Sequence, residues 1–353
     1  MNFMKSLPYY DDLTARQTIK LRELIKTLPP FAKEFFRAID STTQVRTRIA
    51  YAYDLKIFFH FLQEKYPDIE ESDLKNWPVT VLDKVTLTQL EEYLDYLRLY
   101  EDAENKVHTN EERGRMRKTA SIRTFYKFFY RKQVIKNNTA SLLNLPKKHE
   151  HTIVRLEIDE IAKLLDAVEE GDNLTKSQKK YHNKTKIRDL AILTLLLGTG
   201  IRVSECVGID ISNLDFETNG MKIHRKGGAD VILYFGEEVR EALLDYLEER
   251  EKIIPKEGSE NALFLSMQKR RISVRAVENL VKKYARPVTP LKTITPHKLR
   301  STYGTQLYQE TGDIYLVADV LGHKDVNTTR KHYAAMEDQR RRMAAGKIQL
   351  REK

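Results

Sequence analysis

Residues 186–205 read KIRDLAILTLLLGTGIRVSE, an apolar stretch that is closed by two glycines. Its leucines recur at helical spacing, which predicts a helix over 186–198 with a buried face. Gly198 and Gly200 end this helix, because glycine readily adopts the backbone conformation of a helix stop. The apolar run is well short of the roughly 18 residues that a membrane-spanning helix needs. The stretch therefore predicts the core helix of a soluble globular domain, and we expect no membrane span.

The sequence on both sides of this helix predicts a mainly helical unit with one small antiparallel sheet. Apolar residues alternate over 221–223 and 231–235, on either side of Gly227 and Gly228, which predicts a β-hairpin. Residues 173–184 are polar and basic, and we expect a loop there. Further helices are predicted over 157–170, 237–253, 273–284, 297–311, 313–321, 328–335 and 337–350.

The first half of the chain is also predicted to be helical. Apolar side chains share one helix face over 42–64, in the stretch after Thr86, and over 115–132. A leading helical segment at 14–40 precedes them and is interrupted by a pair of prolines. Helical periodicity is lost near 146–152, where we expect a linker. The chain of 353 residues is therefore predicted to form two domains.

The charge balance points to a polyanionic partner. The chain has 61 Lys and Arg and 51 Asp and Glu, which gives a net charge of +10. Nucleic acid is the leading candidate for the polyanionic partner. Residues 106–150 concentrate the excess, with twelve basic side chains against three acidic ones. The basic helix 115–132 supplies the candidate DNA contacts Arg117, Lys118, Arg123, Lys127 and Arg131. The alternative for this helix is a solvated face.

A single cysteine, Cys206, excludes an internal disulfide framework and a cysteine-rich zinc module. A single cysteine also fits a protein of a reducing compartment. The first ten residues contain one lysine and no apolar region of the kind a secretion signal needs. We therefore expect a cytoplasmic protein.

Two segments near the core helix carry side chains that suit phosphate chemistry. Arg202 follows the glycine stop, and Glu205 lies three residues later, so a new helix would let the carboxylate orient the guanidinium. Lys226 lies in the predicted hairpin turn, where its ammonium could reach a phosphate or a leaving oxygen. The ordinary alternatives are a surface ion pair and a solvated lysine.

Two later segments add histidine, arginine and tyrosine. Thr295 and Pro296 suit the start of a helix, which places His297 and Arg300 on one face of its first turns, where anions bind favourably. Residues 321–323 read Leu-Gly-His, and Tyr333 follows ten residues after His323. Taken singly, the histidine suits a helix C-cap and the tyrosine suits packing.

In this order, the four segments resemble the catalytic signature of the tyrosine recombinases. The resemblance covers residues 157–340, and the helical first half is similar to the core-binding domain of that family. Within the family the chain is most similar to the Xer type, in the single-recombinase form called XerS. The resemblance implies a mainly α fold, with a helical, SAM-like core-binding domain and a mixed α/β, mostly helical catalytic domain that has a small antiparallel sheet. The implied boundaries are a leading segment at 1–40, a core-binding domain at 41–148, and a catalytic domain at 149–353 that ends in a C-terminal exchange helix.

The resemblance implies a phosphate-binding role for four of these residues. Arg202 and Arg300 would clamp the scissile phosphate, His297 would support proton transfer, and His323 would hydrogen-bond a non-bridging oxygen. Attack on a phosphodiester builds negative charge on the equatorial oxygens, and such a set can neutralise it without a metal. The resemblance accordingly implies no cofactor and chemistry that is independent of metal and ATP.

The remaining roles concern the bonds that form and break. Tyr333 would be the nucleophile that forms a covalent phosphotyrosine, and Lys226 would protonate the leaving 5′ oxygen. Glu205 matches an acidic position that steadies the site. A tyrosine has an ordinary pKa of about 10, so a base or a local positive field must assist its ionisation.

Several positions depart from the family pattern, although none removes a catalytic group. Residues 301–304 read Ser-Thr-Tyr-Gly where many relatives have His-Thr-Phe-Ala, and two alanines follow Tyr333. His332 adjoins the nucleophile, but the Leu-Gly-His context assigns the catalytic role to His323. The histidines lack the ligand spacing of a metal site. The leading segment 1–40 is helical, unlike the arm-binding module of many phage integrases.

The resemblance implies a site-specific recombinase that resolves chromosome dimers during cell division, through a 3′-phosphotyrosine and a Holliday junction. The implied partners are double-stranded DNA with a dif-like palindromic site and further copies of the chain in a tetrameric synapse, with the FtsK DNA translocase as another candidate. Three alternatives stay open: an integrase of a mobile element, a non-catalytic DNA-binding protein on the same scaffold, and a topoisomerase-like relaxing enzyme.

Overall fold

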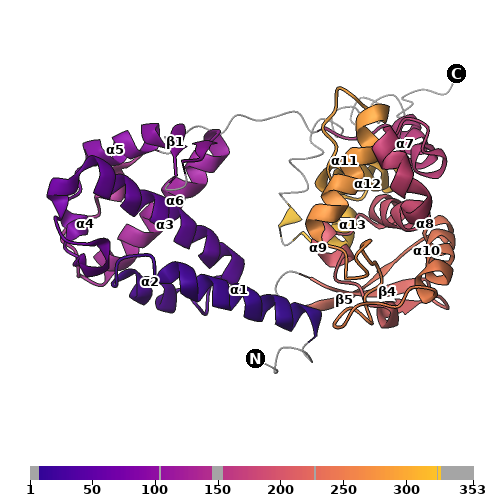
Figure 1. The fold of residues 1–353 in the computed structure, drawn as a ribbon, viewed down its shortest axis with the longest axis horizontal. Helices are drawn as coiled ribbons and strands as arrows, with labels where there is room; N and C mark the ends of the chain where they lie inside the picture. The colour runs from indigo at the N-terminus through magenta and orange to yellow at the C-terminus, as the bar shows by residue number, and fades with distance from the viewer. Residues whose placement is uncertain (1–7, 103–104, 145–153, 226–227, 324, 327–353) are drawn as a thin grey trace, which may run out of the picture. The chain divides into compact units, whose positions relative to one another are not determined.

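The computed structural model describes residues 8–102, 105–144, 154–225, 228–323 and 325–326. The chain divides into two compact units, residues 1–151 and 152–353. Both units are mainly helical, and each contains one small antiparallel sheet (Figure 1). The mainly α fold with a small sheet, which the sequence predicts, is therefore confirmed.

Six helices and a two-stranded hairpin form the described part of the first unit. The helices are α1 (Tyr9–Ile25), α2 (Ala32–Ala38), α3 (Val45–Lys65), α4 (Val81–Lys84), α5 (Leu87–Tyr96) and α6 (Glu112–Arg131), with 3₁₀ turns at Pro67–Ile69, Leu74–Asn76 and Thr139–Leu142. Strands β1 (Leu99–Glu101) and β2 (Val107–Thr109) pair in antiparallel register. The prolines at 29 and 30 divide the leading segment into α1 and α2, as their missing N–H groups require.

Aromatic side chains from α2, α3 and α6 form the centre of this unit. Phe35, Phe59, Phe125 and Phe129 are fully buried, and Phe125 meets Phe35 and Phe129 edge to face. Edge-to-face contact adds to the stabilisation that the buried ring area already gives. The apolar stripes predicted over 42–64 and 115–132 are thus the inner faces of α3 and α6.

The hairpin β1–β2 was not predicted from the sequence. Its strands have three residues each, and the apolar side chains of Leu99 and Val107 are exposed rather than alternately buried. Stacking of the Tyr100 ring on the His108 imidazole and an Asp102–His108 contact of 2.5 Å hold it instead. Such cross-strand pairs leave no period-two pattern in the sequence.

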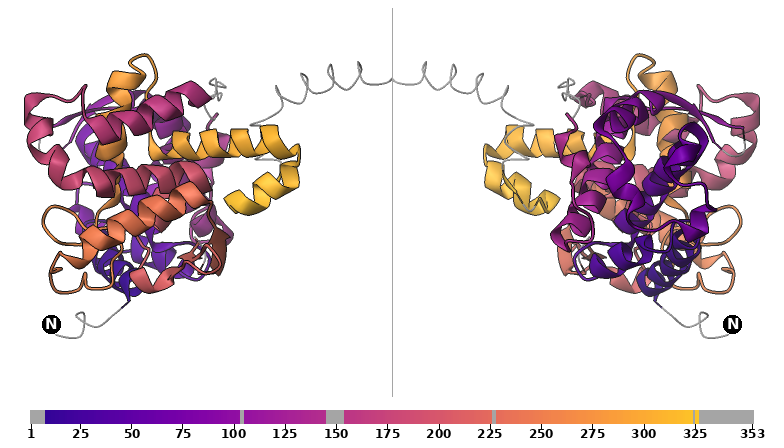
Figure 2. Two further views of the ribbon diagram at one scale, coloured as in Figure 1. Left: turned by 90° about the vertical axis from the view of Figure 1, so that its right-hand side faces the viewer. Right: turned by 90° about the vertical axis from the view of Figure 1, so that its left-hand side faces the viewer.

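The second unit is built around one long helix, α8 (Lys176–Thr199), which packs against α7 (Ile158–Glu170), α10 (Glu237–Glu251) and α12 (Pro296–Thr311). In the left view of Figure 2, α8 and α10 lie side by side. The remaining helices are α9 (Val203–Cys206), α11 (Val274–Val288) and α13 (Ile314–Leu321), with a 3₁₀ turn at Ile211–Asn213. Apolar residues over 191–197 are buried in the centre, as the pattern over 186–205 predicts.

The loop predicted over 173–184 is wrong, because α8 already begins at Lys176. Thr175 and Gln178 form a capping box: the Thr175 hydroxyl accepts from the Gln178 N–H, and the Gln178 side chain accepts from the Thr175 N–H. The first turns of this helix are largely exposed and therefore show no apolar periodicity. The T-x-x-Q pattern was the signal that could have located the helix start.

The predicted β-hairpin is confirmed as β4 (Gly220–His224) and β5 (Asp230–Tyr234), in register from Gly220↔Tyr234 to His224↔Asp230. A two-residue strand, β3 (Leu214–Asp215), extends this sheet at the side of β4. The helices predicted over 328–335 and 337–350 lie outside the described residues. Within the residues that the structure describes, no helix has the length and apolarity of a membrane span.

Candidate active site

The candidate catalytic residues that the structure describes lie at three places in the second unit: the turn from α8 to α9, the first turns of α12, and the end of α13. Gly200 closes α8 and Gly322 closes α13, both in the left-handed backbone region that favours glycine, with φ of 61° and 59°. A Cβ at Gly200 would overlap the ring of Tyr303 on α12. Gly200 thus allows the end of α8 to lie close against Tyr303 of α12 and Leu321 of α13.

Arg202 is held in place by Glu205, as the sequence predicts. Its Nη1 donates to Glu205 Oε1 at 2.8 Å, and its backbone N–H donates to Glu205 Oε2 at 3.0 Å. Glu205 is 4% exposed, whereas the guanidinium of Arg202 is only half-buried. Its Nη2 donates to the Gly322 carbonyl at 3.0 Å, which places Arg202 beside the Leu-Gly-His segment. A buried carboxylate thus orients a guanidinium that still faces solvent.

Arg300 links the same two helix ends from α12. Its Nη1 donates to the Gly200 carbonyl at 2.5 Å, and its Nη2 donates to the Leu321 carbonyl. The side chain is 6% exposed. Arg202 and Arg300 therefore bond to consecutive carbonyls at the end of α13, although they are far apart in sequence.

The two histidines lie before and after Arg300 in the chain. His297 is exposed in the first turn of α12, where Pro296 stands at the first helical positions. Thr295 occupies the N-cap position, although its side chain makes no capping hydrogen bond. His323 directly follows the left-handed Gly322, and its backbone N–H donates to the Ala318 carbonyl at 2.9 Å. His297 thus lies at the start of one helix, and His323 lies just past the end of another.

Lys226 and Tyr333 lie outside the described residues, so their assigned roles stay predictions. No group of three or more His, Cys, Asp or Glu side chains in the described part of the chain is arranged to hold a metal ion. Cys206, which is next to Glu205, is buried, and this burial raises the pKa of its thiol to about 12. A thiol with such a high pKa stays protonated at neutral pH and is a poor nucleophile.

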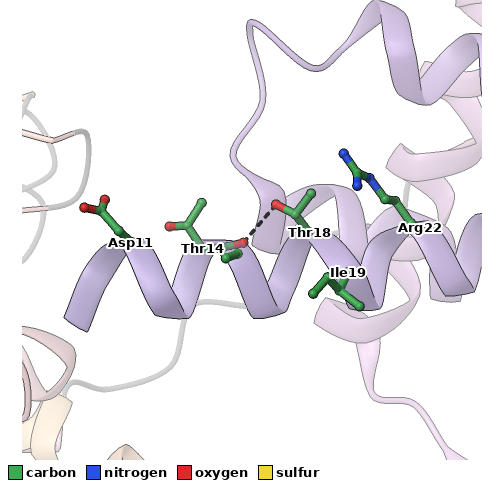
Figure 3. Close-up of a pocket in the computed structure, with 6 residues that line it drawn as sticks. Asp11, Thr14, Thr18, Ile19 and Arg22 are labelled. Carbon is green, nitrogen blue, oxygen red and sulfur yellow. Dashed lines mark hydrogen bonds between the residues drawn. The ribbon is translucent and has the colours of Figure 1, made fainter. Parts of the chain in front are cut away.

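Two hollows on the surface contain none of the candidate catalytic residues. One, of about 400 Å³, lies on α1 along Asp11, Thr14, Thr18 and their neighbours, where the Thr18 hydroxyl donates to the Thr14 carbonyl at 2.8 Å (Figure 3). The other, of about 540 Å³, lies between the start of α8 and the basic side chains Lys282, Lys283 and Arg286 of α11. We assign no function to either.

The candidate DNA contacts on α6 separate into two groups. Arg117 is 47% exposed, and its Nη1 donates to Asp54 Oδ2 at 2.5 Å. Lys118 is 6% exposed, and its ammonium donates to Asn110 Oδ1 at 2.5 Å, so it faces the interior of the unit. Arg123, Lys127 and Arg131 are half-buried or exposed, and no hydrogen bond or ion pair to another described residue holds them. The side chains of these three residues are therefore accessible to a ligand.

The burial of the Asp54 carboxyl makes the stability of the first unit depend on pH. Asp54 is fully buried, and this burial raises the pKa of its carboxyl to about 6, although Arg117 and Lys118 act to lower it. Because the folded-state pKa exceeds the ordinary value, the protonated form stabilises the fold at low pH. That contribution is lost as the pH rises through 6.

Asp54→Asn, which cannot ionise, is therefore expected to gain stability relative to the wild type as the pH rises. The expected gain in the free energy of unfolding is on the order of 1–2 kcal/mol between pH 5 and pH 8. Urea denaturation at the two pH values measures it. Asp95→Asn, at an exposed carboxylate, is the control and should show no such dependence. An equal difference at both pH values would contradict the raised pKa.

The sequence profile of the phage integrase family matches residues 154–340. The chain is 33% identical over 349 residues to the tyrosine recombinase XerC of Caldanaerobacter subterraneus subsp. tengcongensis, a match that covers 95% of this chain and 91% of that one. The chain thus belongs to the phage integrase family, the tyrosine recombinases.

Two solved structures share the fold. One is the XerH site-specific recombinase bound to a palindromic difH substrate, with a TM-score of 0.59, 18% identity, and coverage of 86% of this chain and 79% of that one. The other is a λ integrase dimer bound to a COC′ core site, with a TM-score of 0.59, 16% identity, and coverage of 85% and 93%. The relatives include proteins named XerC and XerD.

Proposed function

We propose that this chain is a site-specific Xer-type recombinase that cuts and rejoins double-stranded DNA through a 3′-phosphotyrosine. The observation that carries the proposal is the convergence of Arg202 and Arg300 on consecutive carbonyls at the end of α13, next to His323. Two guanidiniums at one point, with a histidine next in the chain, are suited to the charge that develops on a phosphodiester under attack. Glu205 keeps one of these guanidiniums in a fixed orientation.

The chemistry needs neither a metal nor ATP in this proposal. Tyr333 gives its hydroxyl proton to a base or to water, and its oxygen bonds to phosphorus. The bond from phosphorus to the 5′ oxygen breaks, and that oxygen takes a proton from Lys226. The number of phosphoester bonds is unchanged, so a second 5′ hydroxyl can reverse the step on another strand. Exchange between two duplexes then leads through a Holliday junction.

We further propose that the DNA site is a dif-like palindrome and that the biological task is the resolution of chromosome dimers in the cytoplasm. The overall likeness to XerC along nearly the whole chain supports this assignment. A tetrameric synapse of the chain would join two duplexes, and the FtsK translocase would be a partner. Within the Xer type, we propose the single-recombinase form XerS.

The direct test incubates the protein with a set of palindromic and mobile-element duplexes and detects covalent adducts on denaturing gels. Adducts on dif-like duplexes, followed by Holliday junctions, are the expected result. Adducts only on element ends would indicate the alternative, an integrase of a mobile element. Relaxation of any supercoiled plasmid without junctions would indicate a topoisomerase-like enzyme. Binding without adducts on every duplex would contradict a catalytic role.

The affinity for DNA is expected to fall steeply with salt, because basic side chains displace counterions from phosphates. If α6 contacts the backbone, Arg123→Ala with Lys127→Ala should reduce the slope of log affinity against log salt by about one unit for each phosphate that the variant no longer binds. The measurement is a titration at four or more salt concentrations. The matched control removes the same charge elsewhere in the first unit, with Lys33→Ala and Lys75→Ala. An equal change of slope in both pairs would argue against α6 as the DNA-binding helix.

A further inference from the structure

A third guanidinium shares the end of α13 with the two candidate phosphate clamps. Arg225 Nη2 donates to the Val320 carbonyl at 2.8 Å, and its Nη1 lies 3.4 Å from the Asp319 carbonyl. Arg300 and Arg202 take the next two carbonyls, those of Leu321 and Gly322. The last four carbonyls of this helix end, 319 to 322, therefore each face an arginine.

The place of Arg225 is closely defined by its surroundings. Carbonyls at a helix C-terminus lack partners within the helix and carry the negative end of its dipole, so a guanidinium there is stabilised. A Cβ at Gly322 would overlap the Arg225 guanidinium. The left-handed turn favours glycine at 322, and any larger residue there would displace the Arg225 guanidinium. The Nε of Arg225 is buried with no partner among the described atoms, so the two Nη contacts are the side-chain hydrogen bonds that hold this guanidinium to the described residues.

Arg225 also holds the base of the turn between β4 and β5. Its backbone N–H donates to the Ala229 carbonyl at 2.9 Å, and its own carbonyl accepts from the Gly228 N–H at 3.1 Å. The backbone of this one residue closes the turn, and its side chain fastens the turn to α13. Lys226 is the next residue in the sequence.

We propose that Arg225 is a positioning residue that ties the base of the β4–β5 turn to the end of α13. The general acid at the next position, Lys226, would thereby act beside the phosphate-binding arginines. This inference rests on the proposed recombinase function. In that reaction Lys226 gives its proton to the 5′ oxygen as the bond from phosphorus to that oxygen breaks. A general acid contributes about 10²–10⁴-fold to such a step, and only when it lies within hydrogen-bonding reach.

The test compares two substrates that differ in one atom. With sulfur in place of the bridging 5′ oxygen, the leaving group is a thiolate, which needs no proton because thiols ionise near pH 8.5. The rate of covalent adduct formation is measured in a single turnover on the oxygen and sulfur duplexes. Arg225→Ala is compared with Lys226→Ala, with the wild type, and with Arg240→Ala, an arginine of α10 that pairs with its neighbour Glu237.

We expect Arg225→Ala to react about 100-fold more slowly than the wild type on the oxygen duplex and within about threefold of it on the sulfur duplex. Lys226→Ala should show the same pattern, and Arg240→Ala should match the wild type on both. The sulfur reaction also reports that the variant is folded and binds DNA.

Two results would overturn the inference while the proposed function stands. One is an Arg225→Ala variant as fast as the wild type on the oxygen duplex, and the other is an equal loss on both duplexes, which would mark a purely structural role. A wild-type protein that binds but forms no adduct on either duplex would overturn the proposed function itself, and this inference with it.

Discussion

Tyr333→Phe is expected to bind a duplex with two half-sites as tightly as the wild type and to form no covalent adduct. The substitution removes only the hydroxyl oxygen that would attack phosphorus, and the basic surfaces that hold DNA are unchanged. Gel-shift titration measures the affinity, and denaturing gels measure the adduct. Phosphopeptide mapping of trapped wild-type complexes should place the phosphate on Tyr333.

The control for this experiment is Tyr315→Phe. Tyr315 is an exposed tyrosine on α13, the helix that ends beside the candidate site, so it offers a second accessible hydroxyl close by. This variant should form the adduct at the rate of the wild type. Adduct formation by Tyr333→Phe, or a mapped phosphate on another tyrosine, would show that the nucleophile is assigned wrongly.

Arg300→Ala is expected to have the second largest effect, on both chemistry and stability. Loss of one preorganised charge donor slows a reaction of this kind by about 10²–10³-fold. The substitution also leaves the buried carbonyls of Gly200 and Leu321 without their donor, with an expected loss of about 3 kcal/mol in the free energy of unfolding. Single-turnover adduct rates and urea denaturation measure the two losses separately.

A substrate with a neutral methylphosphonate at the scissile position separates these two roles of Arg300. This group lacks the charge that the guanidinium would neutralise, so Arg300→Ala should approach the wild-type rate on it. A variant that is equally slow on the charged and the neutral substrate would act only through structure. Comparison with Arg300→Lys, which keeps the charge but cannot span both carbonyls, shows how much of the effect depends on geometry.

Local sequence signals predicted most of the helices and the hairpin of the second unit. Periodic apolar residues located α3, α6 and α8, because a helix that packs on a core must repeat its apolar positions with the helical period. The same reasoning failed at 173–184, where α8 is exposed and only the capping pair Thr175 and Gln178 marks its start. It also failed at β1–β2, whose stability comes from cross-strand pairs.

Amphipathicity likewise predicted that α6 is basic, but not which of its basic residues are available to a ligand. Lys118 and Arg123 are equally polar in the sequence. In the structure, Lys118 lies on the inner side and bonds to Asn110, because a long side chain can bury its methylenes if its ammonium finds an acceptor. Arg117 is engaged by Asp54, which comes from a helix 63 residues earlier.

The sequence by itself determined the identities and the order of the candidate catalytic residues, and also the local pairing of Arg202 with Glu205, since residues three apart on a helix meet without help from the rest of the chain. Only the tertiary structure decided that Arg202, Arg225 and Arg300 meet at one helix end. Their acceptors include the carbonyls of Gly322, Val320 and Leu321, which lie 120, 95 and 21 positions after Arg202, Arg225 and Arg300, respectively. Nothing in a sequence marks one backbone carbonyl as an acceptor, because every residue carries one. The carbonyls at the end of α13 become common acceptors through the left-handed turn at Gly322 and through the packing that brings α9, α12 and the β4–β5 turn to this helix end.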